Sequence, residues 1–258
     1  MTTFSSVATL LVVTTGVCLR GSAENKGARV PVLLELFTSE GCSSCPPADR
    51  LLETLDRTQP VGGAELIVLS EHVDYWDGLG WKDPFSSPQY SARQYGYASK
   101  FHLGTVYTPQ LVVDGRVQLV GGDVREAIAA IENERREQKI AVVVSHAVRN
   151  GNQVTAQIEL PAPQAQSNSG TAVLYVALAE NKTQTQVARG ENAGKALAHV
   201  GVVRTLTQVG AVPLESPLTK EVTLPAQPEV GTNGLRVVAF LQDPSSGHIL
   251  GAAWQKLQ

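Results

Sequence analysis

The chain has 258 residues, of which 43% are hydrophobic and 17% are charged, and its formal net charge at pH 7 is −3. This length suits a globular protein of one or two domains. The small net charge, together with the lack of a strongly basic patch, argues against a nucleic acid as its partner.

The first 23 residues have the pattern of a secretory signal peptide. Residues 7–19 form an uncharged, largely apolar run of the length expected for the central part of such a signal. The run is too short for a membrane-spanning helix, which needs about 20 apolar residues, and Gly21-Ser22-Ala23 offers a cleavage site. No lysine or arginine precedes the run, so a disordered apolar N-terminus is the alternative. We expect a mature protein that is periplasmic or secreted, soluble and without a membrane span.

Residues 28–138 are predicted to form an α/β domain in which strands and helices alternate. Two continuous apolar runs are typical of strands covered on both faces. Apolar residues at helical spacing predict three helices, two of which begin near prolines that the first helical turn tolerates. The expected elements are strands at 30–38 and 64–73, helices at 45–57, 87–102 and 123–138, and a hairpin at 111–121 that turns at Asp114-Gly115.

From residue 139 onward the pattern changes to short strand-like runs separated by turn residues. The clearest run, 153–160, alternates apolar and polar side chains, as a half-buried strand does. Seven such runs predict that residues 139–258 form an antiparallel β-sandwich domain. A polar loop is expected at 161–170 and a longer one at 181–198. The seven runs occupy residues 140–148, 153–160, 171–179, 199–207, 219–225, 234–242 and 248–257.

Two of the three cysteines, Cys42 and Cys45, stand between the first predicted strand and the first predicted helix. Export would remove Cys18 with the signal peptide and leave this pair in an oxidising compartment. A helix N-terminus favours a thiolate, so the pKa of Cys42 is expected to be lowered. The spacing predicts thiol–disulfide exchange, with Cys42 as the exposed nucleophile and Cys45 as the resolving thiol.

A closed structural disulfide and a metal site are the alternatives for the cysteine pair. So short a loop stabilises little in the chain-entropy model, which disfavours a purely structural role. His72 follows a strand whose C-terminal end should lie near the cysteines, so Cys42, Cys45 and His72 could bind copper or zinc. The plainer interpretation of His72 is a hydrogen-bonded loop histidine, and that of Asp74 and Asp77 is a turn or capping role.

The order of the elements at residues 30–138 resembles the thioredoxin fold. Thr108-Pro109 immediately precedes the predicted hairpin, where a proline is natural and a cis peptide bond is possible. The resemblance implies that Pro109 is cis and faces the cysteine pair. With Thr108 it would then hold the strand of a substrate.

Four stretches together look like a family of poorly characterised secreted bacterial proteins with a thioredoxin-like domain. They are FTSEGCSSCPPAD, HVDYWDGLGWKDPF, YTPQLVVDG and GENAGKALAHVGVVR. The resemblance implies fold and location more than activity. The chain departs from thioredoxin itself at Gly41, which stands where thioredoxin has tryptophan, and in a long insert at 72–100. These departures leave the direction of electron flow open.

Glu35 lies one position out of register with the buried aspartate of thioredoxin. A carboxylate on a mostly apolar strand is costly unless it is paired. Glu35 is therefore expected either to accept a proton from Cys45 or to form an ion pair with the insert. It completes the set of candidate site residues with Cys42, Cys45, Thr108 and Pro109.

The aromatic and polar residues outside this set have structural interpretations. Trp76 and Trp81 are expected to pack the insert against the first domain, with an apolar wall for a partner peptide as the alternative. The polar residues of the longer loop are expected to pack that loop on the first domain, with a partner-binding surface as the alternative. They are Arg189, Glu191, Asn192, Lys195 and His199.

The favoured function is that of a thiol–disulfide oxidoreductase-like protein whose partner is a protein thiol or disulfide. No cofactor is expected, and no motif supports a hydrolase or a nucleotide site. Two alternatives stay open. One is a copper- or zinc-handling accessory protein, and the other is a non-catalytic binding module in which the β-sandwich acts and the disulfide is structural.

Overall fold

The computed structural model describes Met1 and residues 29–161, 170–228 and 231–257. The expected signal peptide therefore lies, apart from Met1, outside the described residues, and so does most of the loop predicted at 161–170. Within the described ranges, no helix is long and apolar enough to cross a membrane.

The described residues of the first half form four strands and three helices close to the positions that the sequence predicts. Ser87 caps the second helix by accepting a hydrogen bond from the backbone N–H of Gln89, and Asp123 caps the third in the same way. Asp114 and Gly115 both have positive φ and form the hairpin turn. The elements are β1 (Val30–Thr38), α1 (Pro46–Thr58), β2 (Ala64–His72), α2 (Pro88–Lys100), β3 (Gln110–Val113), β4 (Val117–Val120) and α3 (Val124–Glu134).

The described part of the second half forms seven strands, in agreement with the seven predicted runs. Two of them, β7 and β8, are much longer than expected. They occupy half of residues 181–198, and residues 187–195 connect them. The expectation of a long loop there was wrong because two paired strands continue through polar sequence. The strands are β5 (Val143–Asn150), β6 (Gln153–Leu160), β7 (Thr171–Gln186), β8 (Ala196–Pro213), β9 (Leu218–Pro225), β10 (Leu235–Gln242) and β11 (Ile249–Lys256).

The two halves share one mixed sheet. Its eight strands run in the order β11-β10-β7-β8-β2-β1-β3-β4, and β5, β6 and β9 form a separate three-stranded sheet. Strand β1 is parallel to β2 and antiparallel to β3, and the junction between the halves is a parallel contact of β2 with β8. Four strands of the expected sandwich thus extend the first sheet. The fold is mostly β, with a mixed sheet and few helices.

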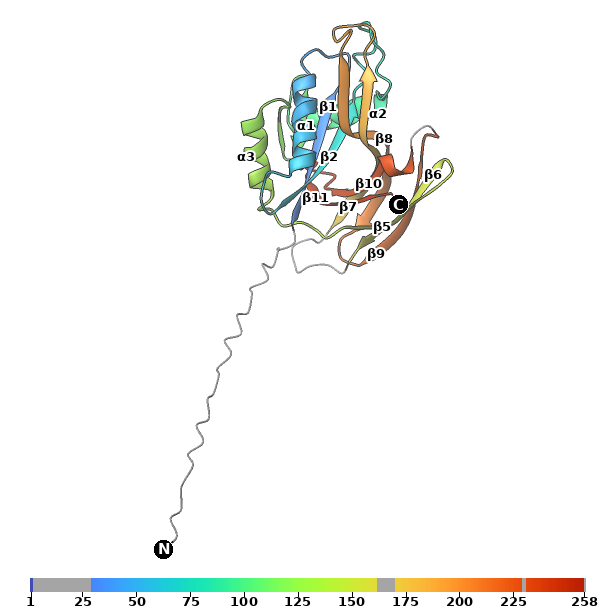
Figure 1. The fold of residues 1–258 in the computed structure, drawn as a ribbon. Coiled ribbons are helices and arrows are strands. Elements are labelled where there is room, and N and C mark those ends of the chain that lie inside the picture. The colour runs from blue at the N-terminus through green and yellow to red at the C-terminus, as the bar shows by residue number, and fades with distance from the viewer. Residues whose placement is uncertain (2–28, 162–169, 229–230, 258) are drawn as a thin grey trace.

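Both faces of the large sheet are covered, as Figure 1 shows. One apolar cluster joins α1 and α3 to the inward side chains of β1 and β2. On the opposite face, Tyr90 of α2 packs with residues from both halves, including Leu33, Ile67 and Phe240. A third cluster lies between the three-stranded sheet and strands β7 and β10. The apolar core therefore crosses the junction between the two halves.

Gly201 lets β8 approach β2. Its φ is +60°, and a Cβ at this position would come within 2.4 Å of the carbonyl oxygen of Val68, so a residue with a side chain would push the strands apart. The neighbouring residue Val202 pairs with Ser70 of β2. This close contact brings the start of β8, with His199, beside the loop that follows β1.

Candidate functional site

The cysteine pair forms a disulfide at the start of α1. Cys42 and Cys45 are bonded, with their Cα atoms 5.4 Å apart, and Cys45 is the N-cap residue of the helix. Both cysteines are 0% exposed, whereas Ser43 and Ser44 between them are exposed. The expectation that Cys42 would be an exposed nucleophile is therefore wrong for this state. The disulfide lies just below the surface.

Trp76 from the insert packs close to Gly41, the residue before Cys42. Its ring N–H donates a hydrogen bond of 2.8 Å to Oγ1 of Thr108, and its Cβ would be 3.2 Å from a Cβ added to Gly41. The lack of a side chain at Gly41 thus makes room for a tryptophan that comes from elsewhere in the chain. Trp76 links the residue before Cys42 to the Thr108-Pro109 segment.

The Thr108-Pro109 peptide bond is cis, as the resemblance implied. A Cβ added to Gly121 would lie 3.0 Å from Cβ of Ala48, in the first turn of α1, and 3.3 Å from Cβ of Pro109. Pro109 therefore lies close to the first turn of α1, the helix that Cys45 precedes.

The segment that connects β7 to β8, residues 187–195, covers the disulfide; we call it the cover. Asn192 is 0% exposed, and its amide donates hydrogen bonds of 2.9 Å to the backbone carbonyls of Glu40 and Cys42. The exposed Glu191 accepts a bond of 3.0 Å from the backbone N–H of Ser43. The expectation that this segment packs on the first half is confirmed by these contacts. Lys195 bonds to Asn192 within the cover.

A buried cluster of two histidines and three carboxylates adjoins the disulfide. Its members are at most 4% exposed, and they are Glu40, Asp49, His72, Asp83 and His199. His199 lies between two carboxylates, with Nε2 3.5 Å from Oε1 of Glu40 and Nδ1 3.6 Å from Oδ1 of Asp49. Burial alone lowers the pKa of His199, but Asp49 and Glu40 outweigh it and raise the pKa to about 10. His199 is therefore an imidazolium at neutral pH.

The other half of the buried cluster is the pair His72 and Asp83. Nδ1 of His72 lies 2.7 Å from Oδ2 of Asp83, and the rings of His72 and His199 meet edge to face at 4.7 Å. Although burial raises the pKa of Asp83, its contacts with His72 and with backbone N–H groups lower it overall. The ring N–H of Trp81 donates a hydrogen bond to Oε2 of Glu40, the other oxygen of the carboxylate that faces His199.

Comparison with known proteins places the chain in a family without an assigned role. The model of the family described as "Protein of unknown function (DUF1223)" matches residues 33–242. The chain belongs to this family. Among curated proteins, no sequence matches the chain.

A crystal structure of another protein supports the fold of this DUF1223 chain. This protein comes from Agrobacterium tumefaciens, and its sequence is 32% identical to that of the present chain. The two structures align with a TM-score of 0.66, and the alignment covers 88% of this chain and 94% of the Agrobacterium chain. Two further solved structures are much less similar. A domain of the outer membrane lipoprotein Omp28 from Porphyromonas gingivalis is 14% identical and aligns with a TM-score of 0.33 over 47% of this chain and 89% of that chain. OgpA from Akkermansia muciniphila is 12% identical and aligns with a TM-score of 0.26 over 46% of this chain and 28% of that chain.

Glu35 takes the second of the two roles expected for it. Its carboxylate pairs with Nε of Arg93 of α2 at 2.5 Å and accepts a hydrogen bond from the hydroxyl of Tyr97. Glu35 alternates along β1 with Leu34 and Leu36, which pack in the cluster under α1, so it points to the opposite face of the sheet. A role as proton acceptor for Cys45 is therefore not supported.

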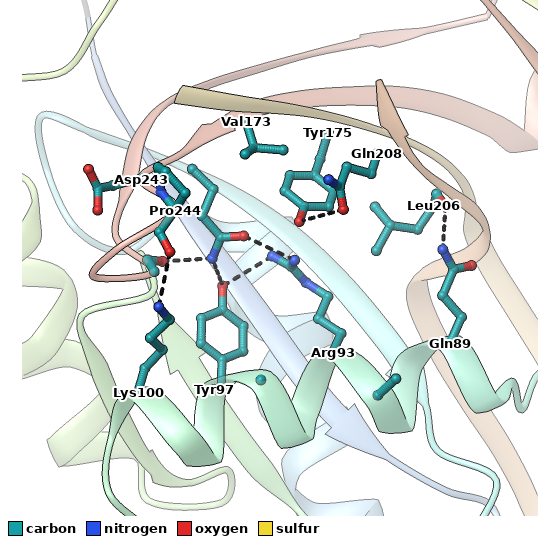
Figure 2. A pocket seen from close by; sticks show the side chains of 14 residues that line it. Gln89, Arg93, Tyr97, Lys100, Val173, Tyr175, Leu206, Gln208, Asp243 and Pro244 are labelled. Atoms are coloured by element: carbon teal, nitrogen blue, oxygen red, sulfur yellow. Dashed lines mark hydrogen bonds between the residues drawn. The ribbon is translucent and has the colours of Figure 1, made fainter. Parts of the chain in front are cut away.

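Arg93 and Tyr97 also line a pocket of about 440 Å³ on that opposite face. Figure 2 shows them on α2, facing Tyr175 and Gln208 across the pocket. Glu71 lies 3.5 Å from Nε of Arg93. Burial and then the nearby Glu35 raise the pKa of Glu71 well above its usual range. Sequence reasoning missed this pocket because it is built from segments far apart in the chain.

The histidine proposed as an alternative metal ligand is engaged elsewhere. His72 is paired with Asp83, and no group of three or more potential ligands that could hold a metal ion occurs among the described residues. The plainer interpretation of His72, a hydrogen-bonded histidine, fits its contacts. Asp77 accepts a hydrogen bond from Ser86 within the insert, and Asp74 accepts one from Ser91 of α2.

Glu40, Asp49 and Asp83 are the members of the buried cluster that sequence reasoning missed. Glu40 and Asp49 flank the cysteine motif. For Asp49 the sequence held a signal, because it stands four residues after Cys45 at the start of the predicted helix. Side chains four apart on a helix share one face. The burial of that face by His199, 150 residues later, had no local signal.

Proposed function

We propose that this protein exchanges thiols and disulfides through Cys42 and Cys45, as an exported oxidoreductase-like protein with a thioredoxin-like unit at residues 28–138. The observation that carries the proposal is the disulfide at the N-terminus of α1, the helix whose first turn lies close to the cis-proline Pro109. The order β1–α1–β2–α2–β3–β4–α3 supports the thioredoxin-like unit. The apolar run at 7–19 supports export to an oxidising compartment.

The proposed exchange has two steps. A substrate thiolate attacks Sγ of Cys42, the Cys42–Cys45 bond breaks, and its electron pair leaves on the sulfur of Cys45. A second substrate thiolate then attacks the mixed disulfide, releases Cys42 as a thiolate, and leaves the substrate oxidised and this protein reduced. The same steps in reverse oxidise this protein at the expense of a substrate disulfide. The N-terminus of α1 stabilises the thiolate that forms.

Because the disulfide is buried, a substrate must first gain access to it. A substrate sulfur must reach Cys42, which the cover shields in the closed state, so the cover has to move before the attack. Three hydrogen bonds fix the cover to the site: the amide of Asn192 donates to two backbone carbonyls, and the carboxylate of Glu191 accepts from one backbone N–H. A partner protein that displaces these bonds would open the site.

The direct test is capture of a reaction intermediate. A Cys45→Ser protein, expressed with its N-terminal segment so that it is exported, is expected to trap partner proteins as mixed disulfides at Cys42, because the resolving thiol is missing. A matched Cys42→Ser protein should trap none. The complexes are separated on non-reducing gels and identified by mass spectrometry. The proposal fails if the two variants give the same products.

A second candidate function is a binding module in which the disulfide is only structural. The observations that favour it are the complete burial of both cysteines and the separate pocket of about 440 Å³ beneath α2, a volume typical of small-ligand sites. Replacing both cysteines by serine distinguishes the two candidates. A cell that lacks the protein would be rescued by this double variant only if the binding module is the functional part.

A further inference from the structure

The pocket of about 440 Å³ lies between α2 and strands β7 and β8, on the face of the large sheet opposite α1. One side of it is apolar and consists of Val173, Leu206 and the ring of Tyr175. Polar side chains of α2 face this side, as Figure 2 shows. The volume falls in the range of small-ligand sites, which combine apolar walls with a few placed polar groups.

Helix α2 contributes two small residues to the pocket, Ala92 and Gly96. A glycine inside a helix is destabilising relative to alanine. A Cβ added to Gly96 would meet no atom within 4 Å, so no close contact requires a glycine there. Gly96 therefore leaves open space in the wall of the pocket.

Arg93 is a rigidly held donor in this pocket. Its guanidinium lies 5.0–5.1 Å from the centres of three aromatic rings. Of the five N–H groups of an arginine, Arg93 uses three within the described chain, to Glu35, Gln242 and the hydroxyl of Tyr97. Two N–H groups remain on a side chain that is only 8% exposed. A buried donor without a partner is costly, so Arg93 is suited to bind a ligand oxygen.

The opposite wall offers both a donor and an acceptor. The hydroxyl of Tyr175 donates to Oε1 of Gln208, which is the bond made by these two polar groups among the described residues. The NH₂ group of Gln208 is thus left to donate, and the hydroxyl oxygen of Tyr175 is left to accept. A hydroxyl group matches such a site, because it donates and accepts at once.

The charges around the pocket balance one another. Arg93 and Lys100 are positive, and Arg93 is paired with Glu35. Hydrogen bonds from two serines of the same turn lower the pKa of Asp243 to about 2, so its negative charge offsets that of Lys100. Burial and then Glu35 shift the pKa of Glu71 upward, toward its uncharged form. A charged ligand would lose its hydration without meeting a net opposite charge.

We propose that the pocket beneath α2 binds a small neutral polyhydroxyl compound, a mono- or disaccharide unit. Ligand hydroxyls would accept from Arg93 and Gln208 and donate to Tyr175, while the C–H face of the sugar ring packs on Val173 and Leu206. The inference rests on the second candidate function, the binding module, and names its ligand class. It does not depend on the redox state of the disulfide.

The test titrates the purified protein with D-glucose, N-acetyl-D-glucosamine and maltose, with binding read by saturation-transfer NMR. Succinate and spermidine serve as charged probes. At least one sugar is expected to bind, and neither charged probe. Gly96→Trp places a ring in the open space and should abolish the binding. Gly96→Ala is the matched control and should keep the wild-type affinity. The exposed Gln208 gives a third variant, and Gln208→Ala should weaken the binding about tenfold.

The outcomes separate this ligand class from the functions proposed above. No sugar binding, or sugar binding that Gly96→Trp leaves intact, would overturn the inference. Binding of succinate or spermidine alone would overturn the ligand class and retain a binding module. If Gly96→Trp does not fold, Gln208→Ala decides: weakened binding supports the inference and unchanged affinity overturns it. Failure of Cys45→Ser to trap partners would overturn thiol–disulfide exchange without changing the result for the pocket.

Discussion

A single imidazole, that of His199, connects the second half of the protein to the cysteine motif. It comes from β8 and lies between Glu40, just before Cys42, and Asp49, just after Cys45. Its charge is therefore balanced by residues on both sides of the disulfide. The pairing makes His199 a contributor to stability as well as to the site.

The stability of the protein should depend on pH through this residue. The two carboxylates raise the pKa of His199 from 6.5 to about 10, so the folded state holds its proton over a range in which the unfolded chain has lost it. The stabilisation is complete below pH 6.5 and is lost as the pH rises to about 10, on the order of 5 kcal/mol in all. Urea unfolding at a series of pH values measures it. His199→Gln should lack this dependence, and equal pH dependence in both proteins would contradict the assignment.

At the scale of the elements, the cover controls access to the disulfide. Asn192→Ala removes two buried hydrogen bonds to backbone carbonyls, which costs about 1–3 kcal/mol and favours the open state. We expect dithiothreitol to reduce the disulfide about tenfold faster. The exposed Gln184 of β7 offers a control on the same hairpin, and Gln184→Ala should react like the wild type. An unchanged rate in Asn192→Ala would show that the cover does not limit access.

The elements also show what local sequence can and cannot predict. The start of α2 follows from Ser87-Pro88 and the hairpin turn from Asp114-Gly115, because capping and turn geometry depend on neighbouring residues. The motif Cys42-x-x-Cys45 likewise predicted a pair at a helix start. Strand partners are different: alternation gives a strand but not its neighbour. The position of β8 beside β2 depends on the approach of Gly201 to Val68, which no local pattern reveals.

At the scale of the whole molecule, the shared sheet and core predict that the protein unfolds as one unit. Leu33 and Ile67 of the first half pack with Ala177 and Phe240 of the second, and β2 lies next to β8. We expect a single thermal transition by calorimetry, with equal calorimetric and van't Hoff enthalpies. Two transitions, one for residues 28–138 and one for residues 139–258, would instead indicate independent domains.

The same sharing gives the second half a place in the proposed function. The strands predicted as a separate sandwich supply both the cover and His199, so the cysteine motif is enclosed by residues more than 140 positions away. The sequence motif alone predicts an exposed redox pair. In the folded chain the pair is instead shielded by residues of the second half. The local pattern around Cys42 and Cys45 could not indicate this shielding.

The most direct measurement of the central claim is the reduction potential of the Cys42–Cys45 disulfide, determined by equilibrating the folded protein in glutathione buffers and counting alkylated thiols by mass. A working exchange pair is expected between about −270 and −120 mV. A potential below about −300 mV is typical of a structural disulfide. It would contradict thiol–disulfide exchange and leave the pocket beneath α2 as the functional part of the molecule.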